Sequence, residues 1–395
     1  MEIFYPTIRL YPGRERSLLT GHPWIFSGAI AERNADLKAG DVATLLASNR
    51  EPLGLGFYNP DSDIAIRLLT RDPSSRVDFA FWRKRIREAQ QLRQRVIPPK
   101  TNAFRLINAE GDFMPGLVVD RYGEVLVVSI GTAGMEKCRS EILEILAQEI
   151  HPGAILERSE GKSRLREGLA ERMGVCYGSS FPNPLEILEN GLRFQVDLIT
   201  GQKSGFFLDQ RSNRELASLL CGNSSVLNCF SYTGAFSVYC SSGGARKVLS
   251  VDSSEPATQI ARQNLSINGF SAADHPVIKG DVFQFLRDTT ETFDFIILDP
   301  PAFAKSRKDV NRAARGYKDV NWTAMQHLPA DGLLMTFSCS NFVDAMLFNK
   351  IVLGAARDAG KNVQILKTLD AGSDHPVLLA HTEGRYLKGL LLRLS

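Results

Sequence analysis

The C-terminal half of the chain alternates short apolar runs with longer amphipathic segments. Seven runs have the length and composition of strands: Val226–Phe230, Lys247–Val251, Val277–Lys279, Phe293–Leu298, Leu333–Phe337, Val363–Leu369 and Gly389–Leu394. Alternation of this kind is typical of βαβ units. Because helices cover both faces of such a sheet, its strands are apolar throughout. The pattern predicts an α/β fold with a doubly wound parallel sheet and one extra edge strand.

The N-terminal part of the chain is patterned differently. Turn residues separate the strand-like runs Val42–Leu46, Leu53–Tyr58 and Ile64–Leu68, which predicts a small β-rich module. In the segment Val77–Val96 apolar residues then recur every three to four positions, which predicts an amphipathic helix. Its polar face carries Arg76, Arg83, Lys84, Arg85, Arg87, Arg93 and Arg95. This basic face is either a solvated surface or a stripe that faces phosphates.

Two proline-containing breaks divide the rest of the chain, at residues 97–100 and 181–184. Between them we predict strands at Phe104–Asn108, Val125–Ile130 and Ala154–Glu157 and a helix at Met135–Ile150. We therefore expect a β-rich domain at residues 1–75, a basic helix and linker at 76–100, a small central α/β domain at 101–185 and a larger α/β domain at 186–395.

Composition narrows the class of protein. The chain has 395 residues, 44% of them hydrophobic and 23% charged, as in ordinary globular proteins, and its formal net charge is only +3. A nucleic-acid site would therefore be a local patch. The sequence shows no membrane-spanning run and no signal-peptide pattern. Six cysteines without a Cys-x-x-Cys pair predict reduced thiols, no metal site and a cytoplasmic protein.

The turn after the first strand of the larger domain is a candidate cofactor site. It contains only Gly234 and lacks the G-x-G-x-x-G pattern that lets a backbone approach a pyrophosphate. Asp252 ends the second strand and Asp281 follows the third. Carboxylates at these places suit the ribose and base of an adenosine without phosphates, although each could instead cap a helix. Together they favour S-adenosylmethionine.

A polar and aromatic stretch, Thr200–Arg214, precedes that first strand. It is either a lid over the cofactor or a loop anchored by its aromatic residues. The candidate cofactor contacts are therefore Gln202, Lys203, Phe230, Tyr232, Thr233, Gly234, Asp252, Asp281 and Asp299.

Two candidate catalytic residues follow the fourth and fifth predicted strands of the larger domain. Asp299 begins the string Asp-Pro-Pro, and Cys339 lies between two serines. If these strands are neighbours, both residues lie at one crevice past their carboxyl ends. A thiolate that adds to C6 of a pyrimidine makes C5 nucleophilic, while an acidic group holds the edge of the base. We expect Cys339 to be the nucleophile and read Cys229, which lies inside a strand, as a core residue.

Basic residues follow the Asp-Pro-Pro string. They are Lys305, Arg307, Lys308, Arg312, Arg315 and Lys318, with Tyr317 and Trp322 nearby. Such a run binds phosphates and stacks bases in RNA-binding proteins, or is simply a solvated surface. The candidate substrate contacts are Pro300, Pro301, Lys305, Arg315 and Tyr317.

Nine strings make the chain resemble the RlmI-type 23S rRNA (cytosine-C5) methyltransferases over essentially its whole length. They are GHPWIFSGAI, YNPDSDIAIRLL, GDFMPGLVVDRYG, GQKSGFFLDQR, VLNCFSYTGAF, VDSS, LDPPAFAKS, RGYKDVN and FSCS. The resemblance implies an N-terminal PUA domain for structured RNA, a central insert and a Rossmann-like class I methyltransferase domain. It also implies ribosomal RNA as substrate, Cys339 as nucleophile and a possible homodimer.

The residues leave two other functions open. C5 methylation of uridine uses the same thiolate chemistry, and an RNA-binding assembly factor could keep the fold without catalysis. The chain also departs from many RNA cytosine-C5 enzymes, because Ala302 stands where they have a second cysteine after Asp-Pro-Pro.

Overall fold

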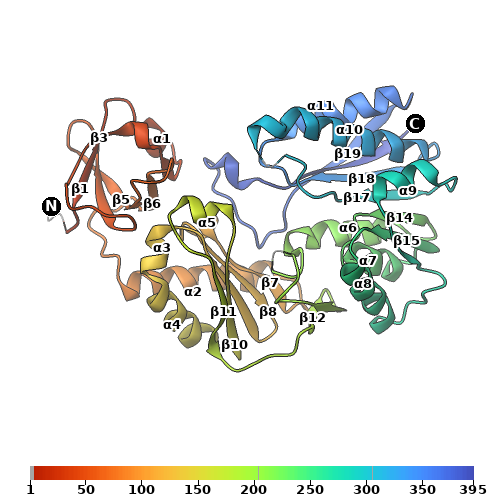
Figure 1. Cartoon of the computed structure of the whole chain (residues 1–395), viewed down its shortest axis with the longest axis horizontal. Coiled ribbons are helices and arrows are strands. Elements are labelled where there is room, and N and C mark those ends of the chain that lie inside the picture. The colour runs from red at the N-terminus through yellow and green to blue at the C-terminus, as the bar shows by residue number, and fades with distance from the viewer. Residues whose placement is uncertain (1–3, 203, 305) are drawn as a thin grey trace. The chain divides into compact units, whose positions relative to one another are not determined.

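The structure, a computed structural model, describes residues 4–202, 204–304 and 306–395. It divides into two compact units (Figure 1). Unit 1 comprises Met1–Leu185 and Ser373–Gly384, and unit 2 comprises Glu186–Gly372 and Arg385–Ser395. The sequence placed Ser373–Gly384 in the C-terminal domain, whereas the structure groups this segment with unit 1. The predicted contacts Lys203 and Lys305 lie outside the described residues.

The first sheet of unit 1 has six strands in the order β2-β6-β5-β4-β1-β3. Its elements are β1 (Thr7–Leu10), α1 (Arg16–Leu19), β2 (Trp24–Ile25), β3 (Ile30–Arg33), β4 (Val42–Leu46), β5 (Pro52–Tyr58) and β6 (Ile66–Thr70). The predicted β-rich module is therefore present. The sequence missed β1, β2 and β3, which are two to four residues long and too short for a period-two pattern to stand out.

The second sheet of unit 1 has five strands in the order β11-β10-β9-β8-β7. Its elements are β7 (Ala103–Asn108), β8 (Leu117–Tyr122), β9 (Val125–Ile130), α3 (Ala133–Lys137), α4 (Arg139–Ile150), β10 (Ala154–Ser159), α5 (Lys162–Arg166) and β11 (Arg172–Gly178). Helix α2 (Phe79–Val96) packs on this sheet through Trp82 and Ile86. The predicted central strands are all present, and β8 and β11 are additional.

The basic face of α2 is largely paired within unit 1. Arg83 and Arg87 both bind Glu149, at 2.8 and 2.7 Å. Arg93 is fully buried, and its guanidinium donates two hydrogen bonds to the carboxylate of Asp112. A continuous stripe of phosphate-facing cations therefore does not form on this helix, because tertiary partners neutralise part of it.

The segment Ser373–Gly384 is held in unit 1 by polar contacts. Arg93 donates to the carbonyl oxygen of Asp374 at 2.8 Å, and the backbone N–H of Arg105 donates to the Asp374 carboxylate at 2.9 Å. The Asn108 amide donates to the carbonyl oxygen of Pro376 at 2.9 Å. These groups lie far apart in sequence, so no local pattern could have assigned the segment.

Unit 2 contains the seven-stranded sheet, in the order β16-β15-β14-β17-β18-β20-β19. Its strands are β14 (Ser225–Cys229), β15 (Lys247–Asp252), β16 (Val277–Lys279), β17 (Phe295–Leu298), β18 (Leu333–Ser338), β19 (Val363–Leu369) and β20 (Lys388–Leu394). All seven predicted strands are present. The first five are parallel, but β20 is antiparallel to both neighbours and lies one place in from the edge, which β19 forms.

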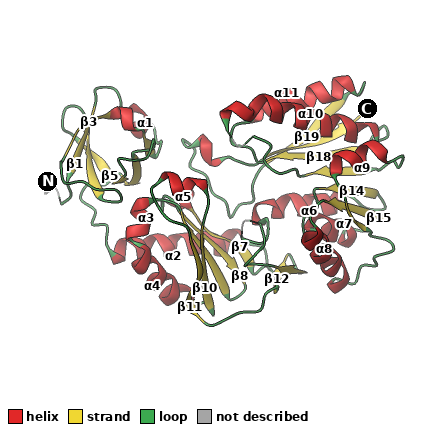
Figure 2. Ribbon diagram, in the orientation of Figure 1, coloured by secondary structure: helices red, strands yellow, loops and turns green. Residues whose placement is uncertain are grey.

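Helices cover both faces of this sheet (Figure 2). They are α6 (Arg211–Leu220), α7 (Ala235–Ser242), α8 (Glu255–Ile267), α9 (Val282–Asp288), α10 (Val310–Gln326) and α11 (Ala345–Asp358), and a hairpin of β12 (Leu185–Glu189) and β13 (Leu192–Val196) precedes them. Consecutive residues of β14 point to opposite faces and so to two cores: Leu227 packs with α9, α10 and α11, whereas Val226 packs with α6 and α7. The sheet is therefore the rigid middle layer that positions the site.

Candidate functional site

A cavity of about 270 Å³ lies in unit 2 at the carboxyl ends of the parallel strands. Predicted residues that line it are Gln202, Phe230, Tyr232, Thr233, Asp252, Asp281, Asp299, Pro300, Pro301 and Cys339. Further lining residues include Asp209, Arg214, Ser231, Phe283, Phe303 and Leu387. The candidate cofactor residues and the candidate chemistry residues therefore share one cavity.

The turn between β14 and α7 is tightly constrained. Gly234 has φ +74°, and a Cβ there would lie 2.9 Å from the Cβ of Ala261 in α8. The glycine therefore allows close helix packing and is not itself among the cavity-lining residues. Phe230 and Tyr232 also have positive φ values, +58° and +47°, which is uncommon for residues with side chains. Such backbone strain persists where surrounding contacts fix it, and it is frequent at binding sites.

Asp252 and Asp281 are each anchored by backbone N–H groups. The Asp252 carboxylate accepts from Tyr232 at 2.8 Å and from Ser254 at 2.9 Å. Asp281 accepts from Gln284 at 2.9 Å and is the N-cap of α9. The capping role and the cavity-lining role therefore occur together at Asp281. Carboxylates fixed in this way suit hydroxyl and amine donors and disfavour a pyrophosphate.

The stretch Thr200–Arg214, which leads into α6, has features of both predicted alternatives, a cofactor lid and a loop anchored by aromatic residues. Phe206 is buried against Phe194 and lies under the guanidinium of Arg214, so an aromatic residue anchors the stretch. Gln202 and Gln210 nevertheless line the cavity. The side chain of Gln210 donates to the Asp299 carboxylate at 3.0 Å, which ties the stretch to the Asp-Pro-Pro turn.

Asp299 and Cys339 follow neighbouring parallel strands. β17 and β18 pair in register, with Leu298 opposite Thr336, so both chains leave the sheet at the same edge. The thiol of Cys339 contacts the carbonyl oxygen of Pro300, with 3.9 Å between the sulfur and the oxygen. The prediction that the thiol and the carboxylate share one crevice is confirmed.

Cys339 differs from Cys229 in its surroundings. All six cysteines are free thiols. Cys229 is fully buried in the core, and burial raises the pKa of its thiol far above the usual range, as expected for an inert core residue. Cys339 is only partly buried and lines the cavity. Cys339 is therefore a candidate for a reactive thiol, whereas Cys229 is a structural residue of the core.

Two residues beside Cys339 have roles that the sequence did not predict. Tyr317 was expected to contact substrate, but its side chain is fully buried and its hydroxyl hydrogen-bonds Ser340 at 2.9 Å. Burial raises the pKa of Tyr317, so it stays neutral. That prediction is wrong, because α10 turns this ring into the core. Lys388 was not predicted, although its ammonium group donates to the carbonyl oxygen of Ser340 at 2.7 Å; a lysine at the start of an apolar strand was the visible signal.

The basic residues after Asp-Pro-Pro lie on the surface of unit 2. Arg307, Lys308 and Arg315 are exposed. Arg312 pairs with Asp309 at 2.7 Å. Substrate contact at Arg315 stays a prediction, with which the exposure of its side chain agrees.

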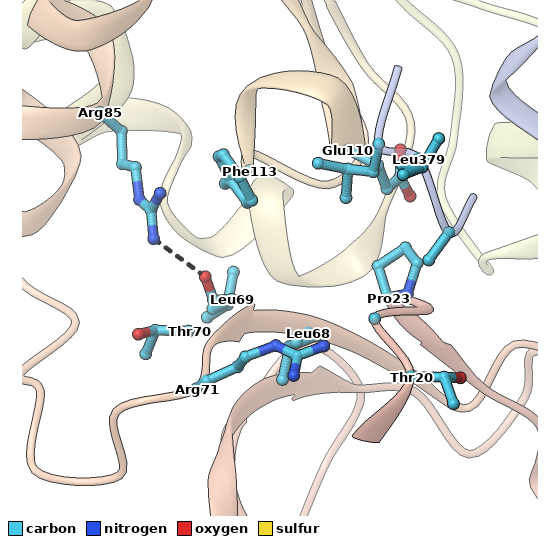
Figure 3. A pocket seen from close by; sticks show the side chains of 13 residues that line it. Thr20, Pro23, Leu68, Leu69, Thr70, Arg71, Arg85, Glu110, Phe113 and Leu379 are labelled. Atoms are coloured by element: carbon cyan, nitrogen blue, oxygen red, sulfur yellow. Dashed lines mark hydrogen bonds between the residues drawn. The ribbon is translucent and has the colours of Figure 1, made fainter. Parts of the chain in front are cut away.

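A larger cavity of about 630 Å³ lies in unit 1 (Figure 3). Pro23, Leu68, Leu69 and Phe113 give it a mostly apolar lining, and Arg85 donates to the Leu69 carbonyl oxygen at 3.2 Å. It holds no thiol and no cluster of carboxylates, so its size alone does not make it a candidate for the chemistry.

The described residues offer neither a cluster of metal ligands nor a membrane-spanning helix. Residues 4–202, 204–304 and 306–395 contain no group of three or more histidine, cysteine or acidic side chains arranged to hold a metal ion. Within the same part of the chain, each helix is too short or too polar to cross a membrane.

The chain is similar to known proteins over nearly its whole length. Residues 8–71 match the PUA-like domain family, and residues 175–376 match the S-adenosylmethionine-dependent methyltransferase family. "Ribosomal RNA large subunit methyltransferase I" of Shewanella denitrificans is 44% identical over 98% of this chain and 99% of its own length. The protein of the same name in Aeromonas salmonicida is 43% identical over 98% of each chain.

Solved structures share the fold. The structure of the protein SMU.776 complexed with SAH has a TM-score of 0.85 and 24% identity, and the alignment covers 98% of this chain and 99% of that one. At that identity the likeness supports the fold alone, which is the predicted arrangement of a β-rich PUA-like domain, a middle α/β sheet and a methyltransferase domain.

Proposed function

The chain belongs to the ribosomal RNA large subunit methyltransferase I family, and we propose that this S-adenosylmethionine-dependent methyltransferase makes 5-methylcytosine in large-subunit ribosomal RNA. Ribosomal RNA is the substrate that the names of the relatives give. The choice of C5 of cytosine follows from the carboxylate of Asp299 and the thiol of Cys339, which line the same cavity.

The cavity residues fit the cofactor. Asp252 and Asp281 present fixed carboxylate oxygens to hydroxyl and amine donors, and Phe283 adds an apolar surface. The strained backbone at Phe230–Thr233 brings peptide groups to the cavity wall. S-adenosylmethionine, when bound there, supplies an electrophilic methyl group.

Cys339 would act as the nucleophile. Its thiol loses a proton, and the sulfur lone pair then forms a bond to C6 of the cytosine, which makes C5 nucleophilic. After C5 has been methylated, a base removes the C5 proton, the C5–C6 double bond re-forms and the sulfur leaves with its bonding electrons. Asp299 would hold the base by accepting a hydrogen bond from the exocyclic amine, while Gln210 fixes the carboxylate.

The observation that carries this proposal is the common edge of β17 and β18. It places a partly buried thiol and an anchored carboxylate in the cavity that also contains the cofactor-type carboxylates. Methylation of an exocyclic amine would require no thiol at this place.

Methyl transfer to unmodified large-subunit ribosomal RNA tests the proposal. Wild type and Cys339→Ala would be compared with labelled S-adenosylmethionine, and the product identified by nucleoside mass spectrometry. We expect 5-methylcytosine from the wild type and none from the variant. Formation of 5-methyluridine would select the uridine alternative, and full activity of Cys339→Ala would overturn the covalent mechanism.

We also propose that exposed cations of unit 2 contact the RNA backbone. Arg307, Lys308 and Arg315 follow the Asp-Pro-Pro turn and are exposed, and phosphate contacts of this kind position a substrate without reading its sequence. Pro300 and Pro301 line the cavity and would flank the base. Homodimerisation stays a prediction.

A further inference from the structure

Lys388 lies beside the end of β18, the strand that Cys339 follows. In the antiparallel pairing of β18 and β20, Lys388 is directly opposite Ser338, the residue before Cys339. Its ammonium group donates to the carbonyl oxygen of Ser340, the residue after Cys339, at 2.7 Å. It also donates to the carbonyl oxygen of Tyr386 at 2.6 Å. The cation is thus fixed by the carbonyl oxygen of the residue after Cys339 and by that of Tyr386, which precedes its own strand.

We propose that Lys388 is a positioning residue whose ammonium group stabilises the thiolate of Cys339. The inference rests on the nucleophilic role proposed above and deepens it, since it names the group that makes the thiol reactive. In this role the thiol proton leaves to solvent, Lys388 keeps its own protons, and the sulfur lone pair becomes available for attack on C6.

Carboxylates in the cavity oppose ionisation of the Cys339 thiol, and a nearby cation offsets their effect. Asp209, Asp252, Asp281 and Asp299 line the same cavity, and nearby carboxylates raise the pKa of a thiol. The neutral phenol of Tyr317, bound to Ser340, adds no charge.

Arg214 also lines the cavity, but its charge is already paired with a carboxylate. Its guanidinium makes a buried ion pair with Glu189, with hydrogen bonds of 2.8 Å to both carboxylate oxygens. Lys388 instead donates to neutral carbonyl groups, so its full positive charge acts on its surroundings.

The titration of Lys388 is consistent with this arrangement. Burial lowers the pKa of Lys388 to about 8, while the charges of Cys339 and Asp344 act in the opposite direction. Since the lysine loses its proton as the pH rises through this value, the ammonium group is present below about pH 8. The electrostatic support of the thiolate is therefore available at neutral pH and is lost in alkaline solution.

The test is the pH dependence of alkylation at Cys339, measured with iodoacetamide and peptide mass spectrometry on the protein without RNA. In wild type we expect Cys339 to titrate below the usual thiol range. Lys388→Met should shift its apparent pKa upward by about one unit and slow alkylation about tenfold at pH 7. Lys388→Arg, which keeps the charge, should restore most of the reactivity.

A structural role would give a different result. If Lys388 only braced the carbonyl oxygens of Ser340 and Tyr386, Lys388→Met could lower the melting temperature, but the apparent pKa of the thiol would not move. That outcome overturns the proposal. Lys361→Met is a matched control, because Lys361 is also partly buried and donates to a carbonyl oxygen, that of Leu328. It should leave the alkylation profile unchanged.

A reciprocal measurement covers the case in which Lys388→Met fails to fold. Coupling between two titrating groups is mutual, so removing the thiolate in Cys339→Ala must lower the pKa of Lys388. Amine labelling of Lys388 as a function of pH would show this shift, and an unchanged profile would refute the coupling.

These measurements separate the two proposals. Alkylation and amine labelling need neither RNA nor a methylated product, so they test the Cys339–Lys388 pair alone. Active Cys339→Ala would remove the covalent mechanism even if the pair were electrostatically coupled. Inactive Cys339→Ala with an unshifted thiol in Lys388→Met would retain the mechanism and remove the role of Lys388.

Discussion

The cavity in unit 2 has two halves that are built differently. On the β14–β15 side, Asp252 is held by two backbone N–H groups. One belongs to Ser254, two residues further along the chain, and the other to Tyr232, in the turn after β14. On the β17–β18 side, Asp299 is held by the side chain of Gln210, 89 residues away, and the backbone at Cys339 is held by Lys388. The half proposed to bind the cofactor relies on backbone geometry, whereas the half proposed to react relies on distant side chains.

This difference has a consequence for substitutions. A backbone N–H group still donates when the side chain of its residue is replaced. The half of the cavity proposed to bind the cofactor should therefore respond mainly to substitutions of the carboxylates themselves. In the reacting half, an anchor and the group that it anchors act together, and their effects should be non-additive.

The largest expected effect is that of Cys339→Ala. Removal of the proposed nucleophile should lower kcat by about 10⁴-fold or more, because covalent addition to C6 requires the thiol. Single-turnover methyl transfer measures it. Cys229→Ala is the control, because this cysteine lies in the core. It should cost about 1 kcal/mol of unfolding free energy and leave methyl transfer intact. Equal losses in both variants would contradict the distinction between the two thiols.

Asp299→Asn comes next. Loss of the charge should weaken the hold on the exocyclic amine and lower kcat/KM by about 10²- to 10³-fold. Steady-state kinetics measures the loss. Gln210→Leu should lower kcat/KM by a smaller factor. The loss of kcat/KM in the double variant should be smaller than the product of the two single losses. Simple multiplication of the effects would show that Gln210 does not act through Asp299.

Asp252→Asn should act on the cofactor rather than on the chemistry. Replacing one charge-assisted acceptor should raise the KM for S-adenosylmethionine about 10- to 100-fold and change kcat little. Isothermal titration with S-adenosylhomocysteine gives the binding part directly. A fall in kcat at saturating cofactor would break the proposed division of the cavity into two halves.

The smallest effect is expected outside the cavity. Arg315→Ala should raise the KM for ribosomal RNA only a few-fold and make binding less salt-dependent by about one phosphate contact. Binding measured over a range of salt concentrations provides the test. Arg193→Ala is the control, since Arg193 pairs with Glu186 on the hairpin of unit 2. An unchanged salt slope in Arg315→Ala would remove Arg315 from the RNA-binding surface.

The sequence predicted most of the methyltransferase fold and part of the site. Most strands of unit 2 were visible because buried strands are continuous apolar runs, whereas β16 and β19 are largely exposed. Asp252, Asp281, Asp299 and Cys339 were visible because each lies at or just after the end of a strand, and parallel strands end at one edge. Gly234 was correctly placed in the turn, but its lack of a side chain serves packing against Ala261.

The sequence by itself determined what depends on neighbouring residues: strand periodicity, turn chemistry and the residues that end each strand. Tertiary structure alone decided the order of β20 and β19, the burial of Tyr317 and the pairing of the basic face of α2 with Glu149. It also placed Lys388 beside Cys339, 49 residues away. The physical reason is that burial and charge pairing depend on groups brought together from distant parts of the chain, and no local pattern records them.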